Sequence, residues 1–203
     1  MKLNPWKSLA GAALAAALLA TPAFAALKKG DRAPQFSLEA SLAGKAFRFS
    51  LKKELKKGPV VLYFFPSAFT KGCDLEAHTF SDDMGEFVKA GAFVLGVSAD
   101  SLGRLKAFSR DPKYCAGKVP VGSDPRGKVA ARYGLKLSPA RNGLKDVRGA
   151  RIDHAFIPRT TFVIARDGRV AAEFSTEADN LSPQEHVLKA LEAARALGAG
   201  KAE

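Results

Sequence analysis

Residues 58–73 read GPVVLYFFPSAFTKGC, and this stretch decides the fold. The run from Val60 to Phe65 is continuously β-branched or aromatic, which is typical of a central strand buried on both faces. Pro66 ends that run. From Cys73 onward apolar residues recur at helical spacing, at Ala77, Phe80, Met84, Phe87 and Val88. We therefore expect a buried strand, a short loop and a helix whose first turn holds Cys73 with its sulfur facing inward.

Strands and helices alternate on both sides of this unit. Residues 35–39 and 46–49 predict an N-terminal hairpin across Ala43-Gly44-Lys45. Further along, the pattern predicts strands at 92–98 and, weakly, 119–121, short helices at 102–108 and 128–133, and a hairpin of 160–164 with 170–174. Ser182-Pro183-Gln184-Glu185 is a capping box that opens a final helix with apolar positions at 187, 188, 191 and 197. The order predicts an α/β fold with a central mixed sheet flanked by helices.

The segment from Gly134 to Pro158 has no convincing periodicity over about 25 residues. Irregular segments of that length are usually functional or disordered. This one leads directly into Arg159, so we expect it to lie near a functional site.

The first 25 residues have the three parts of a secretion signal. Lys2 and Lys7 are basic, Leu9 to Ala20 is apolar, and Ala23-Phe24-Ala25 fits the small-x-small cleavage pattern. The apolar run would span only about 18 Å as a helix, which is short of a bilayer core of roughly 30 Å. We predict a cleaved signal at 1–25 and one mature domain at 26–203, of 203 − 25 = 178 residues, exported to a bacterial periplasm. A retained apolar anchor is the alternative.

The chain is strongly basic, with a formal net charge of +12 that falls to +10 when Lys2 and Lys7 are removed. Most cations are scattered, and the densest group surrounds Glu54 without interleaved aromatic residues, at Lys52, Lys53, Lys56 and Lys57. This pattern favours a solvated face over a nucleic-acid or lipid-headgroup site. We expect no nucleic-acid partner and no stable membrane insertion.

Cys73 and Cys115 are the only cysteines. Two thiols are too few for a disulfide scaffold or a four-ligand zinc site. A Cys-x-x-Cys oxidoreductase motif is absent because Glu76 stands at its second position. In an oxidising compartment, a static bridge between the two remains an alternative.

Cys73 is expected at the start of a helix, where unpaired backbone N–H groups and the helix dipole stabilise an anion and lower a thiol pKa. Arg159 is always charged and offers a fork of donors to a thiolate or a peroxide oxygen. Thr70 offers a hydroxyl, and Pro66 would shield the sulfur from water. Each of these residues alone has an ordinary structural explanation, but together they predict one reactive pocket.

The pattern Pro66-x-x-x-Thr70-x-x-Cys73 after a buried strand, with Arg159 at the start of a later one, resembles the peroxiredoxin family from about Gly30 to the C-terminal helix. The resemblance implies a thioredoxin-like fold and a thiol-dependent peroxidase. Cys73 would reduce hydrogen peroxide or an organic hydroperoxide and become a sulfenic acid, with Thr70 and Arg159 activating it. No metal or organic cofactor is implied.

The resemblance also bears on the second thiol. His78 occupies the position five residues after Cys73 where one large subgroup keeps its resolving cysteine, so the chain is closer to bacterioferritin-comigratory-protein-like members that resolve from a later region. Cys115 would then form a redox-active disulfide with Cys73, and a thioredoxin-like dithiol protein would reduce it. An inert Cys115 is the alternative, and the enzyme would be a monomer or a homodimer.

A second function class stays open, an exported thioredoxin-fold copper carrier that uses Cys73 and His78. Metal binding would leave Pro66 and Thr70 without a role, and a second close thiol is missing. His78 is more simply explained as a solvated or hydrogen-bonded histidine. His154 lies in the long irregular segment beside Arg159, where it either lines the peroxide entrance or is structural, and neither histidine is placed in the site.

Overall fold

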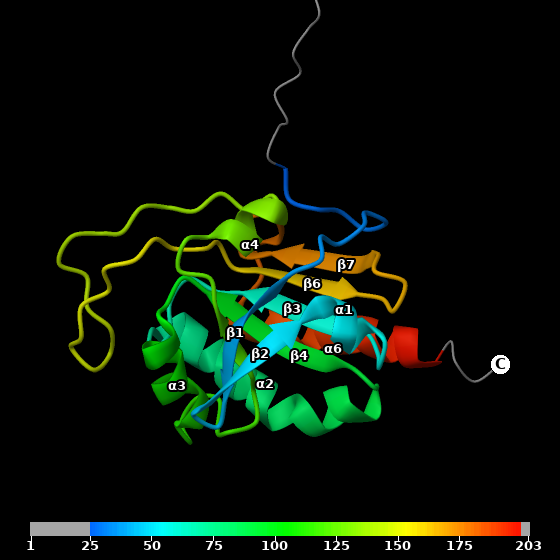
Figure 1. Cartoon of the computed structure of the whole chain (residues 1–203), viewed down its shortest axis with the longest axis horizontal. Coiled ribbons are helices and arrows are strands. Elements are labelled where there is room, and N and C mark those ends of the chain that lie inside the picture. Colours follow the sequence, from blue (N-terminus) through cyan, green and yellow to red (C-terminus); the bar gives the residue numbers. More distant parts are fainter. Residues whose placement is uncertain (1–24, 200–203) are drawn as a thin grey trace, which may run out of the picture.

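The computed structural model describes residues 25–199, and the predicted signal at 1–25 therefore lies outside the described residues except for Ala25. The strands are β1 Ser37–Leu42, β2 Lys45–Ser50, β3 Val60–Phe64, β4 Phe93–Ser98, β5 Val121–Ser123, β6 Thr160–Ile164 and β7 Val170–Ser175. The helices are α1 Leu51–Leu55, α2 Lys71–Lys89, α3 Leu102–Arg110, α4 Lys128–Arg132, α5 Thr176–Asp179 and α6 Pro183–Ala199. Figure 1 shows the helices packed on both sides of a twisted sheet.

All seven strands belong to one mixed sheet in the order β2-β1-β5-β4-β3-β6-β7. The pairs β3–β4 and β4–β5 are parallel, and the other neighbours are antiparallel. The predicted N-terminal hairpin is β1–β2, which turns through Ala43 and Gly44 at φ values of 50 and 77. The predicted mixed sheet with flanking helices is confirmed.

Strand β3 is the centre of the molecule, and all five of its residues are buried. Its alternating side chains enter two different cores because successive residues of a strand point to opposite faces. Val60, Leu62 and Phe64 pack with residues of α1 and α4. Val61 and Tyr63 pack on the other face with residues of α2, α3 and α6. The prediction of a strand buried on both faces is confirmed.

The position of the N-terminal end of α2, which carries Cys73, is set by the end of β3. The strand stops before Pro66, the chain crosses a short loop, and α2 begins at Lys71, so that Cys73 is its third residue. Ala77, Phe80 and Phe87 are buried along the same face, as predicted. Val88 is 66% exposed, contrary to prediction, because it lies one position beyond Phe87 and faces solvent.

The long segment between α4 and β6 contains no helix or strand between residues 134 and 158. Two isolated antiparallel bridges, Ser138–Phe156 and Lys145–Arg151, fold it back on itself. Figure 1 shows this segment, in yellow-green, leaving α4, extending to the left beyond the sheet and returning to β6. The sequence prediction of a long irregular segment is confirmed.

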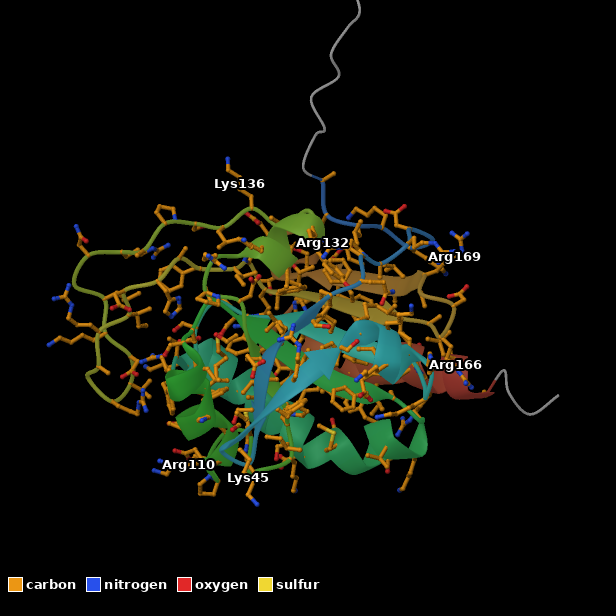
Figure 2. The ribbon with its side chains drawn as sticks, in the orientation of Figure 1. Lys45, Arg110, Arg132, Lys136, Arg166 and Arg169 are labelled. Atoms are coloured by element: carbon orange, nitrogen blue, oxygen red, sulfur yellow. The ribbon has the colours of Figure 1, made fainter. Side chains whose placement is uncertain are left out.

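The exposed cations are dispersed over the described surface. Figure 2 shows Lys45 with Arg110 at one edge, Arg132 with Lys136 near α4, and Arg166 with Arg169 at the β6–β7 turn. Between residues 25 and 199, no helix has the length and apolar character needed to cross a membrane.

Candidate active site

Cys73 lies in the first turn of α2 and is only 2% exposed. Its sulfur accepts a hydrogen bond from Arg159 Nη2 at 3.3 Å, although 86 residues separate the two in sequence. Antiparallel pairing of β6 with β3 explains the meeting, since Thr160, the residue after Arg159, is the register partner of Phe64. The C-terminal end of β3, which leads to Cys73, therefore lies beside the N-terminal end of β6, which follows Arg159.

Gly72 leaves room for the Arg159 guanidinium. A Cβ atom at residue 72 would lie 3.3 Å from Arg159 Nη2, which is tighter than an ordinary carbon contact. The absence of a side chain lets the guanidinium lie directly against the first turn of α2.

Arg159 also pairs with Glu76, whose Oε2 accepts from Nη1. Glu76 is fully buried, and its second oxygen, Oε1, has no hydrogen-bond partner among the described residues. Burial raises the pKa of this carboxyl to about 7, while Arg159 acts in the opposite direction. Glu76 was not among the site residues predicted from the sequence. Its signal was a carboxylate one helical turn after Cys73, on the stripe that continues to Ala77 and Phe80.

The expected depression of the Cys73 pKa is wrong for this closed, fully packed arrangement. Burial raises the pKa of the thiol above its ordinary value, because an anion loses its hydration in the core. Arg159 and the Thr70 hydroxyl oppose that effect, and the carboxylate of Glu76 adds to it. The helix start alone does not set the pKa of this sulfur.

Thr70 is the residue that precedes α2, and its backbone carbonyl accepts from Asp74 N at 2.8 Å. Its hydroxyl donates to the Ser67 carbonyl at 2.8 Å, and it makes no side-chain cap to the helix. The hydroxyl therefore braces the loop in this state.

Pro66 begins the loop that leads to Cys73 and lines a cleft. Together with Pro158, the residue before Arg159, it lines a cleft of about 340 Å³ whose other walls come from Ser138, Arg141, Leu144, Phe156, Ile157 and Glu177. The cleft thus adjoins the loop that carries Cys73 and the chain that carries Arg159. The long segment forms most of its walls.

Cys115 is fully buried in the turn that follows α3, in the same core cluster as Cys73. Both cysteines are free thiols, so the static bridge is absent from this state. Burial raises the pKa of Cys115 far above its ordinary value, and the negative charges of Asp74 and Asp111 raise it further. Of the predicted residues, Cys73, Thr70 and Arg159 lie around one sulfur, Pro66 lies at the adjoining cleft, and Cys115 is set apart from the Arg159 contact.

The second predicted function class requires metal ligands. Between residues 25 and 199, no group of three or more His, Cys, Asp or Glu side chains could hold a metal ion. His78 is half-exposed on α2 and lies 3.4 Å from Asp82, which gives it an ordinary surface pairing.

Known proteins resemble this chain in sequence and in fold. Residues 29–173 match the model of the AhpC/TSA family. Rv1608c of Mycobacterium tuberculosis, which is named as a candidate peroxiredoxin, is 34% identical over 174 residues that cover 86% of this chain and all of that protein. A chloroplastic peroxiredoxin Q of Sedum lineare is 32% identical over 86% of this chain and 81% of its own length. Among solved structures, peroxidoxin BcpB of Mycobacterium tuberculosis is 34% identical, with a TM-score of 0.67 over 84% of this chain and 97% of that one.

Proposed function

The chain belongs to the AhpC/TSA family and is a thiol-dependent peroxidase, and from that premise we propose that Cys73 attacks the peroxide and that Cys115 resolves the product. The resemblance to peroxiredoxins and the thioredoxin-like fold predicted from the sequence are confirmed by these relatives. The copper-carrier alternative finds no support in them.

In the proposed first step, the Cys73 thiolate attacks one oxygen of the peroxide. A sulfur–oxygen bond forms, the oxygen–oxygen bond breaks, and the departing oxygen leaves as water or an alcohol after it takes a proton. Cys73 becomes a sulfenic acid. Arg159 stabilises the charge on the sulfur and on the departing oxygen, because its guanidinium stays charged at any physiological pH.

The observation that carries this proposal is the 3.3 Å contact of Arg159 Nη2 with Cys73 Sγ inside a site from which solvent is excluded. Burial raises the pKa of Cys73, and a fixed cation beside the buried sulfur offsets part of that penalty on the thiolate, with an effect larger there than in water. We place the peroxide entrance at the cleft lined by Pro66 and Pro158, since Pro66 belongs to the loop that precedes Cys73 and Pro158 directly precedes Arg159.

In the proposed second step, the Cys115 thiol attacks the sulfenic sulfur, a disulfide forms and one water molecule leaves. Both thiols are buried, Cys73 in the first turn of α2 and Cys115 in the turn after α3, and in this proposal one of these two segments unwinds before the sulfurs meet. The region around Cys115 is suited to that motion, because residues 112–118 are turns without regular helix or strand structure.

A thioredoxin-like dithiol protein then supplies two electrons and two protons to the disulfide. We place this cycle in an exported compartment on the strength of the signal pattern at residues 1–25, so the donor would be a dithiol protein of that compartment.

Intact mass after one equivalent of hydrogen peroxide tests both roles. We expect the wild-type protein to lose two hydrogen atoms, because Cys73 and Cys115 close a disulfide. Cys115→Ser should instead gain one oxygen and then a second one, as the unresolved sulfenic acid is oxidised to sulfinic acid. Cys73→Ser is the control and should keep its mass under the same exposure. An unchanged mass in the wild type would contradict the role of Cys73, and an identical outcome in wild type and Cys115→Ser would contradict the role of Cys115.

A further inference from the structure

A cluster of charged side chains fastens the long segment between α4 and β6 to the loop that carries Cys73. It consists of Asp100 and Arg104 from the β4–α3 connection and α3, and of Asp146, Arg148 and His154 from the long segment. We call these five residues the loop clamp. None of them was in the site predicted from the sequence, and the peroxidase chemistry proposed above does not use them.

Asp100 is the centre of the loop clamp and is fully buried. Its Oδ2 accepts from the backbone N–H of Ala68 at 2.8 Å and from the Ser98 hydroxyl at 2.7 Å. Its Oδ1 lies 2.7 Å from Arg104 Nε and 2.9 Å from His154 Nε2. One carboxylate therefore joins the reactive loop, α3 and the long segment.

Arg104 links the reactive loop to Asp146 of the long segment. Its Nη2 donates to the Ala68 carbonyl at 2.8 Å and also lies 2.9 Å from Asp146 Oδ2. Asp146 in turn accepts two hydrogen bonds from the Arg148 guanidinium, at 2.8 and 3.1 Å. Both the N–H and the C=O of Ala68 are thus held by the loop clamp.

Phe69 is covered by the same segment. The Arg148 guanidinium carbon lies 3.1 Å from the centroid of the Phe69 ring, and Val147 N donates to the Phe69 carbonyl at 3.0 Å. Phe69 has a φ of +60, a left-handed conformation that is strained for an aromatic residue. It lies four positions before Cys73, so the loop clamp maintains a strained backbone at the entrance to the reactive helix.

The geometry around His154 calls for an imidazolium. Its Nδ1 lies 2.9 Å from the Ala155 carbonyl, and its Nε2 lies 2.9 Å from Asp100 Oδ1. A carbonyl and an ionised carboxylate can only accept, so both ring nitrogens must carry a proton for both contacts to be hydrogen bonds. The Ser67 hydroxyl, 3.2 Å from Nε2, can donate or accept and does not change this requirement.

We propose that the loop clamp holds residues 67–73 in the folded, peroxide-ready form, and that loss of the His154 proton loosens it and so favours the unwinding that brings Cys73 to Cys115. The proposal rests on the roles assigned above to Cys73 and Cys115. His154, Arg104 and Arg148 are positioning residues here, because they act on Cys73 only through the backbone of the loop.

The sign of the pH dependence follows from the groups that face His154. Burial lowers its pKa, Asp100 and the Ala155 carbonyl raise it, Arg104 lowers it, and the net direction is upward from 6.5. A histidine whose pKa is raised by folding stabilises the folded state below its unfolded pKa, and that contribution is lost as the pH rises through the folded pKa. The loop clamp is therefore tightest in acid and loosens toward alkaline pH.

Hydrogen exchange on the fully reduced protein tests the proposal without peroxide or disulfide chemistry. The measured quantity is the exchange rate of backbone amides in residues 67–76 at pH 6 and pH 8.5, corrected for the intrinsic pH dependence of exchange. In the wild type we expect the corrected rate to rise about tenfold between the two values. His154→Gln should exchange fast at both values, because glutamine does not titrate. His78→Gln, a matched change on the exposed face of α2, should behave as the wild type.

Arg148→Ala separates the two parts of the loop clamp. It removes the cover over Phe69 but leaves His154, so exchange should be faster at both pH values while the rise between them remains. The amides of α6 report folding and should stay protected in every variant. Equal protection of residues 67–76 in wild type and His154→Gln at both pH values would overturn the proposal, as would a pH-dependent rise that survives in His154→Gln. The mass experiment on Cys115→Ser is unaffected by either result, so a failure here is distinct from a failure of the proposed function.

Discussion

At the scale of single residues, one cation, Arg159, contacts two groups that can each carry a negative charge, Cys73 and Glu76. A negative Glu76 uses part of that positive charge and repels a thiolate, whereas a protonated Glu76 leaves the guanidinium to the sulfur. Since the pKa of Glu76 is about 7, the two protonation states of this carboxyl are both accessible near neutral pH.

Glu76→Gln should lower the pKa of the Cys73 thiol. The substitution removes a carboxylate that raises this pKa and keeps an amide oxygen that can accept from Arg159. The measurement is the rate of alkylation by iodoacetamide against pH, in a Cys115→Ser background so that only one thiol reacts. We expect the midpoint to move to lower pH by about one unit, which corresponds to about 1.4 kcal/mol. A midpoint that stays or moves upward would show that Glu76 supports the thiolate instead.

The sequence predicts those residues whose chemistry is visible in a local pattern. Pro66, Thr70 and Cys73 lie within one loop and helix start, and Arg159 enters a strand, so their positions follow from secondary structure. Glu76 and Asp100 were missed because their roles depend on burial and on partners more than 30 positions away, at Arg159 and at Ala68. Sequence periodicity shows that a residue faces inward, but it does not identify the charged partner that the residue contacts in the core.

At the scale of elements, two glycines differ in the space around their Cα atoms, Gly96 in strand β4 and Gly85 in helix α2. Gly96 is paired with Tyr63 across β3 and β4, and a Cβ at residue 96 would lie 2.5 Å from Tyr63 Cζ. Gly85 lies within α2, and a Cβ there would meet no atom within 4 Å.

The two glycine-to-alanine substitutions should therefore act in opposite directions. Gly96→Ala forces Tyr63 out of its place over β4 and should lower the free energy of unfolding by about 1–3 kcal/mol. Gly85→Ala should raise it by about 0.5–1 kcal/mol, since alanine loses less backbone entropy than glycine in a helix. Urea unfolding of the reduced proteins measures both. Effects of the same sign would contradict the packing described here.

His186 ties α6 to the sheet and makes this tie sensitive to acid. Its Nδ1 lies 3.0 Å from Thr161 Oγ1 in β6, and its Nε2 lies 2.9 Å from Thr176 Oγ1 in α5. Burial, with Arg159 adding to it, lowers the pKa of this histidine from 6.5 to about 4. The unfolded chain thus binds a proton more readily than the folded one, so stability is complete above pH 6.5 and falls as the pH drops toward 4.

His186→Gln should weaken that acid sensitivity. We expect the drop in Tm between pH 7 and pH 4.5 to be smaller than in the wild type, by roughly 5–10 °C, because the variant has no group at this position to titrate. Thermal melts followed by circular dichroism at both pH values give the comparison, with His78→Gln on the surface of α2 as the control. An equal drop in all three proteins would assign the acid sensitivity to other groups.

The elements themselves were well predicted, and the departures have physical causes. The capping box at Ser182 is confirmed, since Ser182 N donates to Glu185 Oε2 at 2.7 Å and Glu185 N donates to Ser182 Oγ at 3.3 Å. Helix α5 was missed because its four residues are too few to show a period. Leu188, one of the apolar positions of the predicted final helix, is 57% exposed next to buried Val187. Leu188 lies about 100° further around the helix than Val187, on the side that faces solvent.

At the scale of the whole molecule, both thiols lie on one side of the sheet, in the core formed with α2, α3 and α6. Around them the rings of Phe69, Phe108 and Tyr114 pack against one another, with centroids 5.0–5.5 Å apart. In the proposed cycle, forming a disulfide between Cys73 and Cys115 pulls at least one thiol out of this packing. Closing it should therefore change the stability of the entire fold.

A static bridge and a redox-active one predict opposite changes in that stability. A bridge that closes a loop of 115 − 73 = 42 residues without disturbing the native packing should stabilise the protein by about 4 kcal/mol. If the bridge requires the first turn of α2 or the Cys115 turn to unwind, the lost burial of one aromatic side chain alone costs about 1.5–3 kcal/mol, and Phe69, Phe108 and Tyr114 are all affected. We therefore expect the oxidised wild type to melt at a lower temperature than the reduced protein, with Cys115→Ser, kept free of peroxide, showing the same Tm with and without reductant. A higher Tm on oxidation would mean that the two sulfurs can meet within the native packing, and unwinding would then have no part in the catalytic cycle.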